Sequence, residues 1–363
     1  MDRSTHASVL CVACRQPDNR QPTTDNTWLE KALTLALLLI ASLLFKPTAT
    51  AQDPQFSQFY AAPLYLNPAL TGNTFQDRII LNYRKQWMGI APGYETFAVS
   101  YDHNDTKLHS GFGGMVLRDV AGSNGLAFTH AAFNYSFEAR IDHKRAIRFG
   151  TRLGYTLRQF DQSSLVFADQ IIREDPSASI EAGFRSRASY FDGSTGAMYF
   201  SEAFWLGVSF NHLNRPQQTL FTDGDARLPV RTSVHTGYRF ATDGQKLRRS
   251  KTYMTIAAHF KAQDKWDQLD VGGYLDHDRV NFGLWYRGLP GMKAYKPGYS
   301  NDDAIIAMVG YETPQQIRIT YSYDVTISLL TMRSGGSHEI SLIYEWPKRG
   351  KNKKWRAVPC PKF

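Results

Sequence analysis

The sequence QIRITYSYDV, which runs from Gln316 to Val325, decides the fold class. Every second residue is aliphatic or aromatic, and the residues between them are polar or charged. Successive side chains of a strand point to opposite faces, so this pattern predicts a strand with one apolar and one polar face. A helix drawn through the same residues would scatter the polar groups around its whole circumference.

The same alternation recurs along the chain, for example in residues 146–158 and 280–287. Counting such segments predicts about fourteen strands, most of them close to the roughly 9–11 residues that cross a bilayer obliquely. Helical patterns are nearly absent, and no βαβ spacing occurs. The predicted strands begin near Gln76, Glu95, Ser110, Gly125, Ala146, Thr195, Ala203, Val230, Ser250, Trp266, Arg279, Asp302, Gln316 and Ser337.

The connections between these segments differ in length according to their order. Those after even-numbered segments are mostly short, and those after odd-numbered segments are mostly long, with residues 242–249 and 263–265 as exceptions. Short turns on the periplasmic side and long loops outside are typical of outer-membrane barrels. The sequence therefore predicts an all-β fold: a transmembrane antiparallel β-barrel of the outer-membrane type, with about 14 strands and both termini in the periplasm.

The composition agrees with a barrel and excludes other classes. A hydrophobic fraction of 42% and a mean hydropathy of −0.39 exclude a protein with several membrane-spanning helices. A barrel strand exposes apolar side chains only at every second position, so it is compatible with this polarity. The net charge of +9 is spread along the chain without the clustered patch of a nucleic-acid-binding protein, so no nucleic acid is expected as a partner.

An export signal precedes the first predicted strand. The apolar run ALTLALLLIASLLF, residues 32–45, follows Lys31 and is followed by the small residues Ala49-Thr50-Ala51. This order predicts a signal peptide with an extended N-region over residues 1–51, cleaved before Gln52; an uncleaved membrane anchor is the alternative. Cleavage leaves Cys360 as the only cysteine, which excludes a disulfide-based fold.

The remaining chain divides into an N-terminal plug-like segment (52–75), the barrel (76–346) and a basic periplasmic tail (347–363). The first of these reads QDPQFSQFYAAPLYLNPALTGN over residues 52–73. Its aromatic side chains would be costly to leave together in water, so we expect it to pack at the periplasmic mouth or in the lumen. It is either a lid or a partner-binding epitope, and the tail is a second candidate contact. The candidate partner-binding residues are Phe56, Phe59, Tyr60, Tyr65, Asn67, Pro68, Gly72, Lys353, Lys354 and Cys360.

Charged residues lie on the polar faces of the predicted strands. Ionisable groups that point into a barrel need either water or an oppositely charged partner. One interpretation is a network of ion pairs that holds the barrel's shape, and the other is an anion-selective pore. The strand number lies between filled small barrels and open porins, so it leaves both interpretations open. The candidate lumen residues are Arg84, Arg148, Arg152, Arg287, Arg318, Asp324 and Glu339.

The sequence contains no pattern that predicts catalysis. Neither G-x-S-x-G nor H-E-x-x-H occurs, and no pair of His or Cys residues has metal-ligand spacing. We therefore predict no enzyme activity, no cofactor and no metal.

Several short blocks resemble one known family. They are the N-terminal segment quoted above, NYRKQWMGI (82–90), SFNHLNRP (209–216), GYRF (237–240), LWYRG (284–288), YSYDVTIS (321–328), GGSHEISLIY (335–344) and PCPKF (359–363). In order and together, they resemble the PorP/SprF family of type IX secretion system membrane proteins. The chain departs from the family in its extended N-terminus and in Ala61-Ala62-Pro63, where a bulkier residue is expected.

The resemblance implies an outer-membrane component of the type IX system, which moves proteins with a C-terminal sorting domain to the cell surface. Its implied partners are outer-membrane lipid, the periplasmic ring lipoproteins and related subunits, and secreted cargo such as large adhesins, which serve gliding in some members. On this reading Phe56 to Gly72 and the basic tail contact periplasmic subunits, and the long loops, especially 160–180 and 214–229, contact cargo. The alternative is a diffusion porin or ligand transporter with an open, arginine-lined lumen.

Overall fold

The computed structural model describes residues 53–346 apart from 91–92, 123–124, 162–167, 174–178, 180–184, 223, 246, 248–249, 265, 290–301 and 329–331. All of these residues belong to one compact unit, Gln52–Phe363. The predicted signal peptide and the basic tail with Lys353, Lys354 and Cys360 lie outside the described residues. Among the helices that are described, none has the length and apolar character needed to cross a membrane.

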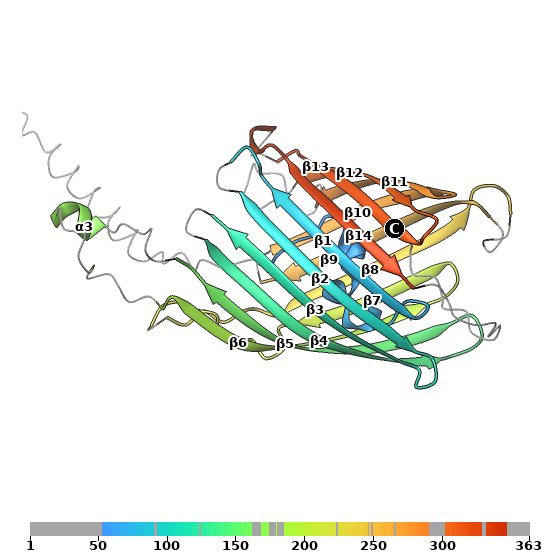
Figure 1. Ribbon diagram of the computed structural model, residues 1–363, viewed down its shortest axis with the longest axis horizontal. Coiled ribbons are helices and arrows are strands. Elements are labelled where there is room, and N and C mark those ends of the chain that lie inside the picture. Colours follow the sequence, from blue (N-terminus) through green and yellow to red (C-terminus); the bar gives the residue numbers. More distant parts are fainter. Residues whose placement is uncertain are drawn as a thin grey trace, which may run out of the picture. The chain divides into compact units, whose positions relative to one another are not determined.

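Antiparallel strands form a closed barrel in which each strand pairs with its neighbours in the chain and the last pairs with the first (Figure 1). This confirms the predicted fold class. The strands are β1 (Asp77–Gln86), β2 (Tyr94–Asp105), β3 (Ser110–Ala121), β4 (Leu126–Arg140), β5 (Ala146–Gln159), β6 (Arg187–Phe200), β7 (Phe204–Asn211), β8 (Arg231–Ala241), β9 (Thr252–Gln263), β10 (Trp266–His277), β11 (Val280–Gly288), β12 (Asp302–Glu312), β13 (Ile317–Thr326) and β14 (Ser337–Glu345).

All but one of the predicted strand starts fall within two residues of an observed start. The prediction of a start near Thr195 was wrong, because β6 begins at Arg187. The first half of β6 carries an inward aromatic residue, Tyr190, next to an outward one, Phe191, and a glycine follows at position 193. With rings on both faces, the alternation between apolar and polar positions disappears from the sequence.

The two faces of each strand meet different surroundings. In β11 the outward Phe282 and Leu284 are exposed, whereas the inward Trp285 and Arg287 are buried. Exposed apolar side chains recur on the outward face around the barrel, which is the pattern of a surface that lipid covers. The polar faces therefore line the interior.

The loops sort to the two ends of the barrel. The connections 87–93, 160–186, 212–230, 289–301 and 327–336 share one end, called here the long-loop end. Parts of them, including most of 160–186 and 289–301, lie outside the described residues; α3 (Ala168–Arg173) and η3 (Met332–Ser334) lie in described parts. The opposite, short-turn end includes the start of β1 and the end of β14.

The chain before β1 lies inside the barrel, where Figure 1 shows it in blue. This inner segment, residues 53–75, contains only single turns: η1 (Phe59–Ala61), α2 (Pro63–Leu66) and η2 (Pro68–Leu70). Asp53 contacts Arg231 at the long-loop end, and Gly72 contacts Asp102 close to the short-turn end. The inner segment therefore crosses the lumen from the long-loop end to the short-turn end before β1 begins.

Candidate functional site

Buried polar contacts hold the inner segment to the wall, and the densest group is a charge cluster near the long-loop end. The carboxylate of Glu339 accepts the backbone N–H groups of Ser57, at 2.7 Å, and Gln58, at 3.1 Å. The Arg84 guanidinium donates to Glu339 at 3.2 Å and to Asp324 at 2.9 Å. Asp324 also accepts the Ser57 hydroxyl. The backbone of the inner segment is thus bonded directly to buried charges of the wall.

A second arginine extends the charge cluster to the neighbouring strands. The Arg287 guanidinium donates to Asp324 at 3.2 Å and to Asp270 at 2.8 Å, and it is 1% exposed. The His259 Nδ1 atom lies 3.6 Å from the second carboxylate oxygen of Asp270. Every carboxylate of the cluster therefore has a cationic neighbour, which is the condition under which buried charges are tolerated.

The charge cluster lies across the junction that closes the barrel. Arg84 on β1 stands directly opposite Glu339 on β14 in the strand register. The side chain of Gln58 adds bonds to the Ser322 hydroxyl, at 3.1 Å, and from the Ser341 hydroxyl, at 2.6 Å. The inner segment consequently ties the first strand to the last two strands.

Aromatic side chains fill the lumen next to this cluster. The rings of Phe59 and Tyr60 pack on Trp285, with centroids 5.1 and 5.5 Å away, and Tyr60 also meets Tyr274 at 5.8 Å. All of these rings are at least nine-tenths buried. Because they come from both the inner segment and the wall, this packing excludes water between the two.

Asn67 fixes the middle of the inner segment, and it is fully buried. Its amide nitrogen donates to the backbone carbonyls of Ala197, at 3.3 Å, and Val208, at 3.2 Å, and its side-chain oxygen accepts the Ala69 N–H at 2.9 Å. The wall makes room here with a glycine, since a Cβ atom on Gly196 would lie 2.1 Å from the Asn67 oxygen.

The residues of the inner segment that directly follow Asn67 also pack against a glycine of the wall. A Cβ atom on Gly150 would lie 2.3 Å from the backbone nitrogen of Ala69. Beyond it the Thr71 carbonyl accepts the Ser136 hydroxyl at 2.7 Å, and the Gly72 N–H donates to Asp102 at 2.8 Å. Here backbone packs against backbone, so the fit allows no added side-chain atom.

The outermost contact of the inner segment is an ionic one, called here the Asp53 clasp. The Asp53 carboxylate lies 2.8 Å from Arg231 Nη1 and 2.7 Å from His212 Nε2. The other ring nitrogen of His212 lies 3.0 Å from Asp192. Arg231 also donates to the Tyr65 hydroxyl at 3.0 Å and lies over the Tyr65 ring. An imidazole between two carboxylates makes both bonds only when both nitrogens carry a proton.

The charges of the clasp shift the pKa values of its members. Burial opposes ionisation of Asp53, but the positive charges of His212 and Arg231 outweigh it and hold the pKa of Asp53 below its usual range. Burial likewise opposes protonation of His212, but the carboxylates of Asp53 and Asp192 outweigh it and raise the pKa of His212. Both shifts favour the charged, paired state near neutral pH.

We expect the clasp to be strongest at mildly acidic pH. The lowered pKa of Asp53 contributes stability that is present above the unfolded value of about 3.9 and lost as pH falls through the folded value. The raised pKa of His212 contributes stability that is full below about 6.5 and lost as pH rises through the folded value. A cysteine replacing Gln55 should therefore react faster with an impermeant maleimide at alkaline pH, relative to a free thiol at the same pH.

The matched variant His212→Gln lacks the titrating group. Its relative labelling rate at position 55 should be raised at every pH and should lose the alkaline increase. An alkaline increase of equal size in His212→Gln would show that another group controls the clasp.

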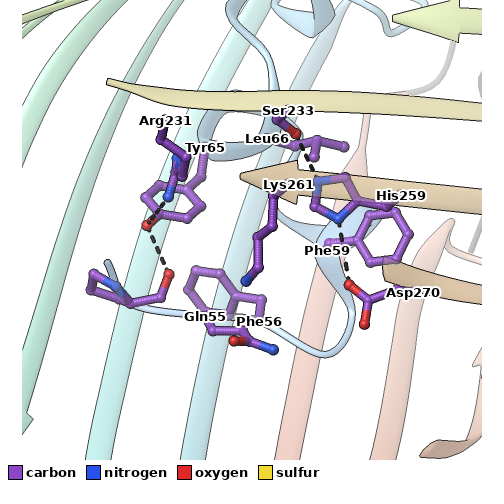
Figure 2. Close-up of a pocket in the computed structure, with 11 residues that line it drawn as sticks. Gln55, Phe56, Phe59, Tyr65, Leu66, Arg231, Ser233, His259, Lys261 and Asp270 are labelled. Atoms are coloured by element: carbon purple, nitrogen blue, oxygen red, sulfur yellow. Dashed lines mark hydrogen bonds and ion pairs between the residues drawn. The ribbon is translucent and has the colours of Figure 1, made fainter. Parts of the chain in front are cut away.

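Two cavities adjoin the clasp. Figure 2 shows the first, where Phe56, Phe59 and Tyr65 of the inner segment face Lys261 and His259 of β9. The second has a volume of about 260 Å³ and lies at the long-loop end. Its lining is Asp53, Gln55, Gln86, Trp87, Arg231, Lys261, Gln263, Trp266, Asp267, Gln268, Gly288, Asp302 and Asp303.

The candidate partner-binding residues that are described face the barrel wall rather than an open surface. Phe56, Phe59, Tyr60, Asn67, Pro68 and Gly72 are buried, and Tyr65 is half-buried. In this arrangement a partner reaches them only if the inner segment leaves the lumen. Their role in partner binding stays a prediction.

The candidate lumen charges fall into separate groups. Arg84, Arg287, Asp324 and Glu339 meet in the charge cluster. Arg152 instead donates to the Leu64 carbonyl of the inner segment at 3.1 Å. Arg148 pairs with Glu138, and Arg318 pairs with Glu312, both nearer the short-turn end.

Sequence reasoning missed the residues of the inner segment that bond to buried charged groups of the wall, namely Asp53, Ser57 and Gln58. It also left His212 unassigned. Nothing in their local spacing distinguishes them, because Asp53 lies about 160 residues from His212 in the chain, and Ser57 and Gln58 lie about 280 residues from Glu339. Within the described part of the chain, no group of three or more His, Cys, Asp or Glu side chains has the arrangement of a metal site.

Comparison with known proteins adds a family match. The model of the family described as type IX secretion system membrane protein PorP/SprF matches residues 48–344. None of the curated proteins compared with the chain matches it.

Solved outer-membrane proteins resemble the barrel at low identity. The Acinetobacter baumannii outer membrane protein Omp33 has 8% identity and a TM-score of 0.42, with 76% of this chain and 100% of that chain covered. The P. putida toluene transporter TodX has 11% identity and a TM-score of 0.45, with 77% and 92% covered. A mutant of the Rh. blastica porin has 7% identity and a TM-score of 0.33, with 75% and 99% covered.

Proposed function

We propose, from the premise that this chain belongs to the PorP/SprF family of type IX secretion system membrane proteins, that it is a closed outer-membrane platform for secreted cargo. Family membership and the barrel fold imply an outer-membrane component of that system. The finer role that we propose is support of the secretion or surface attachment of sorting-domain proteins such as large adhesins, which serve gliding in some members. No catalytic step is part of this proposal.

The observation that carries the proposal is the seating of the inner segment. Its backbone is bonded to the wall at Ser57 and Gln58 near one end and at Gly72 near the other. Aromatic packing fills the space between these contacts. A diffusion porin needs a continuous water-filled lumen, so this filling favours a platform over the porin or transporter alternative.

The charges of the lumen support the same choice. Arg84 and Arg287 are each paired with buried carboxylates, and Arg152 bonds the backbone of the inner segment. Arginines that are neutralised in this way do not form the unpaired positive lining that selects anions. The inward-facing arginines therefore favour a lumen filled by ion pairs and by the inner segment over an anion-selective pore.

The proposed orientation places the short turns in the periplasm and the long loops outside. The end of β14 then leads the basic tail, residues 347–363, toward the periplasmic ring lipoproteins and related subunits. The loops 160–180 and 214–229 are the proposed cargo contacts. In this orientation Asp53 lies at the outer mouth, so the proposal keeps the C-terminus in the periplasm but moves the start of the mature chain to the opposite side.

Planar-bilayer recording tests the closed lumen. The purified protein should show no steady conductance, because the inner segment occupies the lumen. A large, steady conductance from the unchanged protein would contradict the platform and favour the porin alternative.

Deletion of the gene tests the secretion role. Cells without it should retain sorting-domain cargo or shed it loosely, and expression of the unchanged gene should restore surface cargo. Surface cargo that is unaffected by the deletion would overturn the role.

A further inference from the structure

The Asp53 clasp has the composition of a carboxylate-binding site. Its two donors, Arg231 and His212, are 7% and 6% exposed and come from the wall and from the loop after β7. The carboxylate they hold comes from the inner segment itself, at 2.8 and 2.7 Å. A guanidinium and an imidazolium that converge on one carboxylate form strong, charge-assisted hydrogen bonds.

The residue in this site is held less firmly than the rest of the inner segment. In the described chain, the first N–H groups of the inner segment that bond the wall are those of Ser57 and Gln58. Before them the backbone contributes the Pro54 carbonyl, which accepts the Tyr65 hydroxyl at 2.7 Å. The first residues of the inner segment therefore depend on the Asp53 carboxylate, and losing that contact leaves the charge cluster in place.

The clasp opens onto the cavity of about 260 Å³ at the long-loop end, which both Asp53 and Arg231 line. Lys261 lines this cavity and the first one, and among the described residues it forms no ion pair. Figure 2 shows its amino group pointing toward Gln55 and Phe56, away from the His259–Asp270 pair. A lysine amino group thus stands beside the clasp without an ion-pair partner among the described residues.

We propose that Arg231 and His212 form an exchangeable carboxylate site at the outer mouth, in which Asp53 is the resident ligand. The incoming ligand is a carboxylate on a polypeptide at the cell surface, and Lys261 guides it to the site. This inference rests on the proposed function, since that polypeptide is the cargo. When one carboxylate replaces another, Arg231 and His212 still hold a single negative charge. The exchange therefore adds no negative charge at these two donors, near Asp302 and Asp303 of the same cavity.

Competition within the chain sets the expected affinity. A ligand tethered by a short linker has an effective concentration in the millimolar range, so Asp53 excludes carboxylates that bind weakly. Removing the Asp53 carboxylate should raise the affinity of an external carboxylate by about tenfold or more. Removing the guanidinium of Arg231 should abolish the binding.

Calorimetric titration of the purified barrel in detergent tests the proposal. The probe is the tripeptide acetyl-Gly-Asp-Gly-amide, in which the side chain is the only carboxylate, and its matched control is acetyl-Gly-Asn-Gly-amide. The first should bind Asp53→Ala and Asp53→Asn about tenfold or more tightly than the unchanged protein, and the second should bind none of them. Electrophoresis without heating confirms that each variant is folded. Two substitutions are used so that a folding defect of one of them does not decide the result.

Asp77→Asn is the control variant, because it removes a carboxylate that pairs with a histidine, His103 at 2.8 Å, at the short-turn end. Its affinity for the tripeptide should equal that of the unchanged protein.

Equal binding of the asparagine tripeptide, or no gain in affinity in either Asp53 variant, would overturn the site. If acetate bound as tightly as the tripeptide, the site would take small carboxylates and the polypeptide ligand would be overturned. The titration uses the purified barrel alone, so a negative result would contradict only the carboxylate site. Unchanged surface cargo after gene deletion would instead contradict the proposed secretion role.

Discussion

Replacing Arg84 by methionine is expected to lower the free energy of unfolding of the barrel by about 3–5 kcal/mol. The Arg84 side chain is 2% exposed and pairs with Asp324 at 2.9 Å and with Glu339 at 3.2 Å. Methionine fills part of the space but leaves two buried carboxylates with less compensating charge. Urea-induced unfolding in detergent, followed by tryptophan fluorescence, measures the change.

Lys85→Met is the matched control on the next residue of β1. Lys85 also forms an ion pair, with Glu95 at 2.8 Å, but the two side chains are 39% and 51% exposed. Exposed pairs contribute about 0–1 kcal/mol, so this variant should unfold close to the unchanged protein. If both variants lost the same free energy of unfolding, burial of the charge cluster would not explain its contribution to stability.

Gly150→Ala is expected to displace the middle of the inner segment. The added Cβ atom would lie 2.3 Å from the Ala69 nitrogen and 2.3 Å from the Pro68 carbonyl carbon. Neither contact is with a flexible side chain, so the inner segment must move away from the wall at a cost of about 1–3 kcal/mol. The displacement should produce a steady conductance in planar bilayers that the unchanged protein lacks.

Gly193→Ala on β6 is the corresponding control. A Cβ atom at Gly193 meets no atom within 4 Å, so this variant should remain closed and keep its stability. A closed lumen in Gly150→Ala with unchanged unfolding would contradict the close fit between the inner segment and β5. If both variants conducted, the opening of the lumen would not result from the contact between Gly150 and the inner segment.

The strands could be predicted because their pattern is local. In β13 the alternation of Ile319, Tyr321 and Tyr323 with Thr320 and Ser322 follows from the opposite directions of successive side chains. The same rule assigned Arg84 and Glu339 to inward faces before any pairing was known. It failed in the first half of β6, where Tyr190 and Phe191 put rings on both faces.

The inner segment was predicted only in part. Its aromatic residues correctly indicated that it packs against something, and the lumen was one of the two expected places. The pairing of Ser57 and Gln58 with Glu339 was not predictable, because it joins residues more than 280 positions apart. The direction of the inner segment was not predictable either, since both directions bury the same rings.

The sequence by itself determined the barrel: the number of strands, the face that most side chains occupy outside the first half of β6, and the sorting of loops to two ends. These features follow from a period of two and from loop lengths, both of which are local properties of the chain. Only the tertiary structure decided which charges meet and at which end of the barrel the inner segment, residues 53–75, begins. The register of β1 on β14 brings Arg84 opposite Glu339, and the path of the inner segment carries Asp53 to the long-loop end. Both depend on closure of the barrel, which brings together residues that no local pattern connects.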